Sequence, residues 1–195
     1  MKKYSFLLLL VFHSFSYAQN QTNHWNFGSK AALNFNNGIV NVMSDSEMDT
    51  PAGSASISDK QGNLLFYTNG QTVWNRNHAI MENGEGLAGE INNAQTSIII
   101  PKPGTEEKYY IFSTRVNTTT TNPILTKGVY LAEIEISTIY PLGKVLTRFQ
   151  SLRDASTERI TAVHHKDGKA IWLTTFGEAG GATNGIKNTF SSYKI

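Results

Sequence analysis

Short apolar or alternating segments, interrupted by Asn, Gly and Pro, recur along the chain after its N-terminal segment. No run there repeats apolar positions with the period of about 3.6 residues that an amphipathic helix needs. The pattern therefore predicts an all-β protein. The strands that we expect cover residues 25–28, 31–35, 39–43, 54–58, 63–68, 72–75, 96–101, 108–115, 128–136, 144–149, 160–165, 170–176 and 188–194.

Two kinds of strand can be told apart by how polar residues are distributed. In 128–136, apolar side chains alternate with Glu133 and Glu135, which is typical of a half-solvated outer strand. The segments 109–113 (YYIFS) and 170–173 (AIWL) are apolar on both strand faces. We expect those two to be central strands, covered on each side by neighbouring sheets.

One unit appears three times, at 57–68, 99–114 and 163–174. It consists of apolar residues, a tight turn with Lys and Gly, and an aromatic-rich strand. The first copy has the form of a β-turn, with Asp at the first position and Gly at the fourth. We therefore assign structural turn roles to Asp59, Gly62, Gly104 and Gly168, and favour turn positions over an anion site for Lys60, Lys102 and Lys166.

The repeat predicts a β-propeller. The turn glycines are 42 residues apart from Gly62 to Gly104 and 64 residues apart from Gly104 to Gly168, and the first spacing is a normal blade period. We expect residues 19–195 to form about two and a half to three and a half four-stranded antiparallel blades. A closed propeller needs more blades, so we expect either the N-terminal part of a larger protein or a truncated copy.

Residues 1–18 have the features of a secretory signal peptide. Lys2 and Lys3 precede an apolar run at 6–12, and 16–18 (SYA) forms a small-x-small cleavage site. The run is too short to span a bilayer, and no other comparable stretch occurs. We therefore expect secretion to the periplasm, the outer surface or the medium. The sequence contains no Cys, which excludes a lipoprotein anchor, disulfides and thiolate metal sites.

The net charge changes once the signal peptide is removed. Lys2 and Lys3 are two of the 17 basic residues, so 15 basic and 15 acidic residues remain. The chain has no block of Lys and Arg longer than two residues, and nucleic acid is not an expected partner.

Several segments together resemble the N-terminal, WD40-like β-propeller region of large secreted Bacteroidota proteins, many of them gliding-motility or type IX secretion cargo. The segments are 24–35, 54–70, 73–78, 81–89, 95–104, 109–112 and 157–172. The resemblance implies a secreted, surface-displayed propeller followed by further domains. The immunoglobulin-like repeats and C-terminal sorting domain that family members often carry do not occur in this sequence. The resemblance supplies no catalytic residues.

Asp45, Glu47 and Asp49 form the best candidate for a metal site. Carboxylates at every second position are the oxygen ligands that Ca²⁺ prefers, although the glycine and distal glutamate of the helical calcium motif are missing. The alternative is a solvated acidic loop. No other cofactor is expected.

Trp25, Trp74 and Tyr130 are the candidate ligand-binding residues, because they lie on strands that we expect to be peripheral and aromatic rings stack on sugars. No nucleophile elbow occurs, and the loop carboxylates cannot be paired from the sequence: Glu85, Glu90, Asp154 and Glu158. We therefore expect a noncatalytic module that binds or scaffolds a surface polymer or a protein. A glycan-active propeller enzyme and a fragment without function are the alternatives. An enzyme should show two converging carboxylates, one with a raised pKa.

Overall fold

The computed structural model describes residues 20–116, 126–179 and 185–195, and the predicted signal peptide lies outside them. The described chain is all-β, as predicted, and its strands form four small antiparallel sheets, none of which is closed. A 3-10 turn precedes the first strand (η1, Asn20–Thr22) and another follows the second (η2, Asn36–Gly38).

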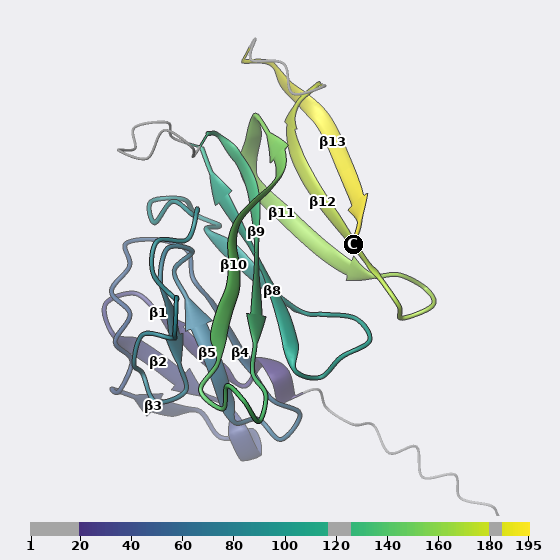
Figure 1. Ribbon diagram of the computed structural model, residues 1–195. Coiled ribbons are helices and arrows are strands. Elements are labelled where there is room, and N and C mark those ends of the chain that lie inside the picture. Colours follow the sequence, from purple (N-terminus) through teal and green to yellow (C-terminus); the bar gives the residue numbers. More distant parts are fainter. Residues whose placement is uncertain (1–19, 117–125, 180–184) are drawn as a thin grey trace, which may run out of the picture.

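The sheets follow one another along the chain, from the purple to the yellow end of Figure 1. Sheet 1 contains β1 (His24–Phe27), β2 (Ala31–Asn34) and β3 (Asn41–Met43), and sheet 2 contains β4 (Ala55–Ser58), β5 (Leu64–Thr68) and β6 (Val73–Asn75). Sheet 3 contains β7 (Ser97–Pro101), β8 (Lys108–Arg115), β9 (Gly128–Glu135) and β10 (Lys144–Asp154), and sheet 4 contains β11 (Ser156–His164), β12 (Ile171–Glu178) and β13 (Lys187–Lys194).

Four strands per sheet were predicted, but among the described residues only sheet 3 has four. In sheet 2 the segment after β6 folds back on that strand without forming a regular partner. The backbone N–H of Met81 donates to the carbonyl of Val73 at 2.9 Å, and the N–H of Val73 donates to Gly84 at 2.7 Å. These bonds satisfy the outer edge of β6, so no fourth strand is needed there.

Every predicted strand has a counterpart, and most ends agree within a few residues. The exceptions meet at Ala155: β10 continues to Asp154 and β11 begins at Ser156, whereas strands were predicted at 144–149 and 160–165. The register between β10 and β9 shifts at three points. Each shift interrupts the alternation of side chains that makes a strand visible in a sequence.

Strand β8 is covered on both faces, as predicted for the YYIFS segment. Ile111 and Phe112 are adjacent in β8 and both fully buried. Ile111 packs in the core between sheets 2 and 3, and Phe112 packs in the core between sheets 3 and 4. Sheet 3 is therefore the middle layer that ties the domain together. The first core contains Ile57, Leu65, Phe66, Val73, Met81, Leu87, Tyr109, Ile111, Ala132, Ile134 and Val145, and the second contains Tyr110, Phe112, Val129, Leu131, Ile160, Ile171 and Leu173.

The prediction of an outer strand at 128–136 is wrong. Strand β9 lies between β8 and β10, and its glutamates, whose side chains are only 19% and 18% exposed, are paired with lysines. Glu133 lies 3.1 Å from the Lys102 ammonium and 3.2 Å from that of Lys108, and Lys108 also approaches Glu135 at 3.8 Å. Burial by itself raises the pKa of Glu133, but the two ammonium groups outweigh it and hold that pKa below its ordinary value.

The AIWL segment is central in its sheet, as predicted, but only one face of the sheet is covered. Ile171 and Leu173 pack in the core, whereas Trp172 between them is 38% exposed. Val163 pairs with Trp172 and is also exposed, and Phe190 lies on the same face, 4.9 Å from Phe176 between ring centroids. The outer face of sheet 4 is therefore open and mixed, because these apolar side chains flank a polar row formed by Thr161, Thr174 and Ser192.

The first strand of each sheet lies beside the first strand of the next: β1 contacts β4, β4 contacts β7, and β7 contacts β11. Side-chain hydrogen bonds connect these strands, which do not share a regular backbone hydrogen-bond ladder. The Gln95 amide donates to the carbonyl of Ile160 at 2.7 Å and accepts its N–H at 3.2 Å. The Ser54 hydroxyl donates to the carbonyl of Asn26 at 2.9 Å, and the Ser56 hydroxyl accepts the N–H of Asn26 at 3.1 Å.

The three predicted turn glycines all have positive φ, at +88° for Gly62, +81° for Gly104 and +67° for Gly168. The Asp59 carboxylate caps the first turn by accepting the backbone N–H groups of Gln61 and Asn63 at 2.9 and 2.8 Å. The structure places these residues at turns, and each glycine occupies a conformation that other residues rarely adopt.

We expect Gly62→Val to destabilise the fold more than Gly168→Val. Both replacements place a β-branched residue at positive φ, at a cost of about 1–3 kcal/mol. A Cβ at position 62 would also stand 2.1 Å from Oδ1 of Asn36, whereas nothing lies within 4 Å of a Cβ at position 168. Asn36 cannot move freely, because its amide donates to the Gly62 carbonyl and accepts from Asn23. Urea unfolding of both variants tests this, and equal losses would contradict it.

Candidate binding site

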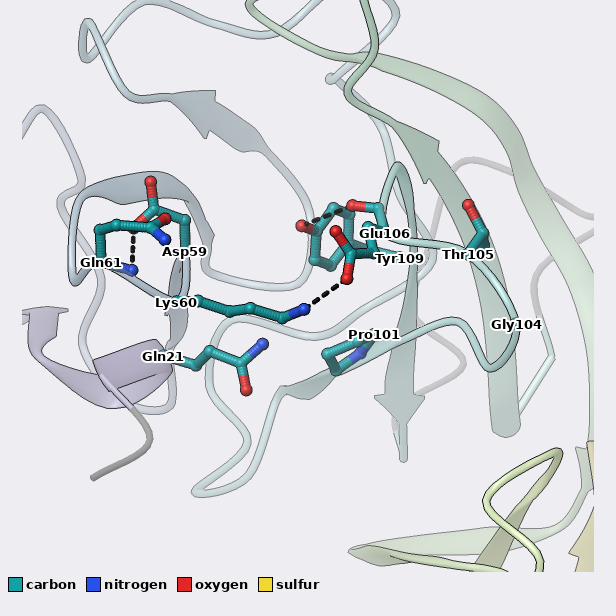
Figure 2. Close-up of a pocket in the computed structure, with 9 residues that line it drawn as sticks. All are labelled: Gln21, Asp59, Lys60, Gln61, Pro101, Gly104, Thr105, Glu106 and Tyr109. Atoms are coloured by element: carbon teal, nitrogen blue, oxygen red, sulfur yellow. Dashed lines mark hydrogen bonds and ion pairs between the residues drawn. The ribbon is translucent and has the colours of Figure 1, made fainter. Parts of the chain in front are cut away.

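A hollow of about 610 Å³ lies between two of the repeated turns (Figure 2). Lys60 reaches from the β4–β5 turn across the hollow and pairs with Glu106 of the β7–β8 turn. The Tyr109 hydroxyl donates to the carbonyl of Glu106 at 3.3 Å. The lining residues are Gln21, Asp59, Lys60, Gln61, Pro101, Gly104, Thr105, Glu106 and Tyr109.

The charged side chains of this hollow already have partners within the protein. The hydrogen bond and charge of Lys60 lower the pKa of Glu106 below its ordinary value. Burial raises the pKa of Asp59, but hydrogen bonds from Asn63 and Gln61 outweigh it, so the net pKa is also lowered. Burial raises the pKa of Tyr109. Neither carboxyl group therefore has the raised pKa that a carboxylic general acid needs at neutral pH, and the Lys60–Glu106 pair joins the two turns.

A second hollow, of about 450 Å³, follows the first strands of sheets 2, 3 and 4, and we call it the first-strand groove. Its lining is uncharged and combines aliphatic side chains with hydroxyl and amide groups. The residues are Ser54, Ala55, Ala94, Gln95, Ser97, Ile98, Ile99, Ile100, Ile160, Thr161 and Ala162.

A third hollow, of about 530 Å³, lies between β1 and β4, and we call it the Trp25 pocket. Ser54, the residue before β4, lines both this pocket and the first-strand groove. Its lining is also uncharged. The residues are Thr22, Trp25, Asn26, Phe27, Ser54 and Ser56.

The structure does not bring the three predicted ligand-binding aromatics together. Trp25 is 52% exposed and lines its pocket. Trp74 is buried and stacks on Tyr67, with ring planes 12° apart. Tyr130 is buried in the internal strand β9 rather than on a peripheral strand, and its hydroxyl donates to the carbonyl of Thr126 at 3.0 Å. Of the three, only Trp25 offers an open ring.

The predicted metal ligands also point to separate partners. Asp45 lies 3.4 Å from the imidazole of His78, Glu47 pairs with Lys30 at 2.8 Å, and Asp49 accepts a hydrogen bond from Ser29 at 2.8 Å. No group of three His, Asp or Glu side chains able to hold a metal ion occurs in the described part of the chain.

Three of the four carboxylates that were predicted in loops each have a separate partner, and two of them lie in strands instead: Asp154 ends β10, and Glu158 is part of β11. Glu90 pairs with Arg115, Glu158 accepts the N–H of Ala94 at 2.7 Å, and Asp154 accepts from Thr126 at 3.2 Å. Wherever a carboxyl pKa is shifted in the described residues, it is lowered: Glu47, Asp59, Glu106, Glu133 and Asp167.

The sequence interpretation missed five residues of the Trp25 pocket: Thr22, Asn26, Phe27, Ser54 and Ser56. Phe27 could have been found, because it lies two positions after Trp25 and therefore on the same strand face. Nothing in the sequence points to Asn26, Ser54 or Ser56, because their place in the pocket depends on β4 lying beside β1.

No family model, no curated protein and no solved structure matches this chain. Among the described residues, no helix has the length and apolar character that a bilayer crossing requires.

Proposed function

We propose that this chain is a noncatalytic binding or scaffolding module with the architecture of an incomplete β-propeller. The side-by-side first strands support this architecture, because the blades of a propeller place their first strands around one axis. The successive cores between sheets 2 and 3 and between sheets 3 and 4 support it as well.

The open outer face of sheet 4 agrees with an unfinished ring. Trp172 and Phe190 are exposed on this face. Exposed apolar side chains on a sheet face normally pack against another layer. Together with the resemblance described above and the predicted signal peptide at 1–18, this face supports a secreted or cell-surface protein of which these residues form the N-terminal part.

The observation that carries the binding role is the uncharged first-strand groove. It holds hydroxyl, amide and aliphatic groups that can contact a ligand, and none of its lining residues is a carboxylate. A glycosidase would need two carboxyl groups facing one cleft, one of them with a raised pKa. The groove therefore favours binding of a polymer or protein segment over its cleavage.

We expect Thr161→Arg to weaken retention of a polysaccharide at least about tenfold, because the arginine would fill the groove. The assay is affinity electrophoresis against soluble neutral and acidic polysaccharides, with reducing ends measured in parallel. Val163→Arg is the matched control: it adds the same charge two residues along β11, at an exposed position that does not line the groove. Accumulation of reducing ends with the unmodified protein, or equal retention of both variants, would contradict the proposal.

A further inference from the structure

The Trp25 pocket has a fixed aromatic wall. The indole N–H of Trp25 donates to the carbonyl of Thr22 at 2.9 Å, and the ring packs against Phe35 with centroids 4.9 Å apart. The side chain nevertheless remains 52% exposed. A ring whose polar atom is satisfied and whose orientation is held loses little conformational entropy when a ligand covers it.

Phe27 extends this wall along the strand. It lies two residues after Trp25, on the same face of β1, and is 38% exposed. At the rise of a β-strand, the two side chains leave the backbone about 7 Å apart. Two successive exposed rings on one strand suit an extended ligand better than a compact one.

The polar groups of the pocket are neutral and retain bonding capacity. Ser56 accepts the N–H of Asn26 and keeps its own hydroxyl proton, whereas Ser54 donates to the carbonyl of Asn26 and keeps its lone pairs. Asn26 also lines the pocket, but its side chain is 2% exposed and lies on the opposite face of β1 from Trp25 and Phe27. The two serines are therefore the polar groups that a ligand on the ring face can reach.

We propose that the Trp25 pocket binds hexopyranose units of a neutral polysaccharide. The aliphatic C–H face of a sugar ring would cover Trp25 and Phe27, and its hydroxyls would exchange hydrogen bonds with Ser54 and Ser56. Because no charged residue lines the pocket, it offers no counter-charge to a uronate or sulfate group. This inference rests on the proposed binding function and names its ligand class. The shared Ser54 lets a longer chain continue into the first-strand groove.

The test compares two tryptophans of the same protein by affinity electrophoresis in soluble β-glucan, mannan and, as acidic polymers, alginate and polygalacturonate. We expect Trp25→Ala to lose at least about tenfold in affinity for a neutral polymer, as truncation of an aromatic anchor does. Phe27→Ala should lose less, and Trp25→Phe should recover part of the loss. Trp172→Ala is the matched control, because Trp172 is exposed on the far end sheet and lines none of the three hollows described above.

Circular dichroism and light scattering after gel filtration accompany each variant. The inference is overturned if Trp25→Ala binds as well as the unmodified protein, if acidic polymers are preferred, or if no neutral polymer is retained. It is also overturned if Trp25→Ala leaves retention unchanged but alters the oligomeric mass, because the ring would then be covered by protein. The two proposals can fail separately. If Thr161→Arg weakens retention and Trp25→Ala does not, the proposed binding function stands and only the proposed role of the Trp25 pocket is overturned.

Discussion

Arg115→Met is expected to lower the free energy of unfolding by about 3–5 kcal/mol. Arg115 is 5% exposed at the end of β8, and its guanidinium donates to the carbonyl of Ala88 at 3.0 Å. It also lies 3.5 Å from the Glu90 carboxylate, whose side chain is only 12% exposed. Methionine would fill most of the volume but would leave Glu90 without its counter-charge and Ala88 without its donor.

Urea unfolding of Arg115→Met, Glu90→Gln and the double variant measures this effect. We expect the double variant to be more stable than Arg115→Met alone, because the neutral amide at position 90 removes the uncompensated charge. A loss below about 1 kcal/mol in Arg115→Met, or a double variant less stable than both single ones, would show that the pair does not hold the loop to sheet 3.

Phe112→Ala is expected to cost about 3–5 kcal/mol, the usual range for removing a buried phenyl ring. Phe112 is fully buried in the core between sheets 3 and 4, where its contacts come from two different sheets. The cavity cannot be refilled without moving one sheet against the other. The loss should therefore appear in the cooperative unfolding of the whole domain, measured by urea titration followed through tyrosine and tryptophan fluorescence.

Phe190→Ala is the matched control for this substitution. It removes the same ring from the outer face of sheet 4, where Phe190 is 75% exposed. We expect a change within about 0.5 kcal/mol. Similar losses in both variants would mean that the outer face of sheet 4 is buried in solution.

Local sequence features were sufficient for the strands and the repeated turns. Alternating side chains located the strands, and Gly62, Gly104 and Gly168 marked turns because positive φ is accessible mainly to glycine. The pattern failed at β10, where bulges break the alternation.

Burial and partners could be predicted much less well. The glutamates of β9 suggested an outer strand, but β9 is internal in its sheet and Glu133 pairs with Lys102 and Lys108. Trp74 and Tyr130 suggested a ligand surface, but both are buried. The residues 45–49 suggested one cation site, but their carboxylates bond to three different side chains.

The sequence by itself determined which segments are strands and where the chain turns, because both depend on residues close together along the chain. Only the tertiary structure decided which faces are covered and which side chains meet. Trp25 and Ser54 share a pocket because β1 lies beside β4, and Trp172 is open because no described sheet covers it. Such contacts join residues far apart in sequence, so they depend on how whole sheets pack rather than on local pattern.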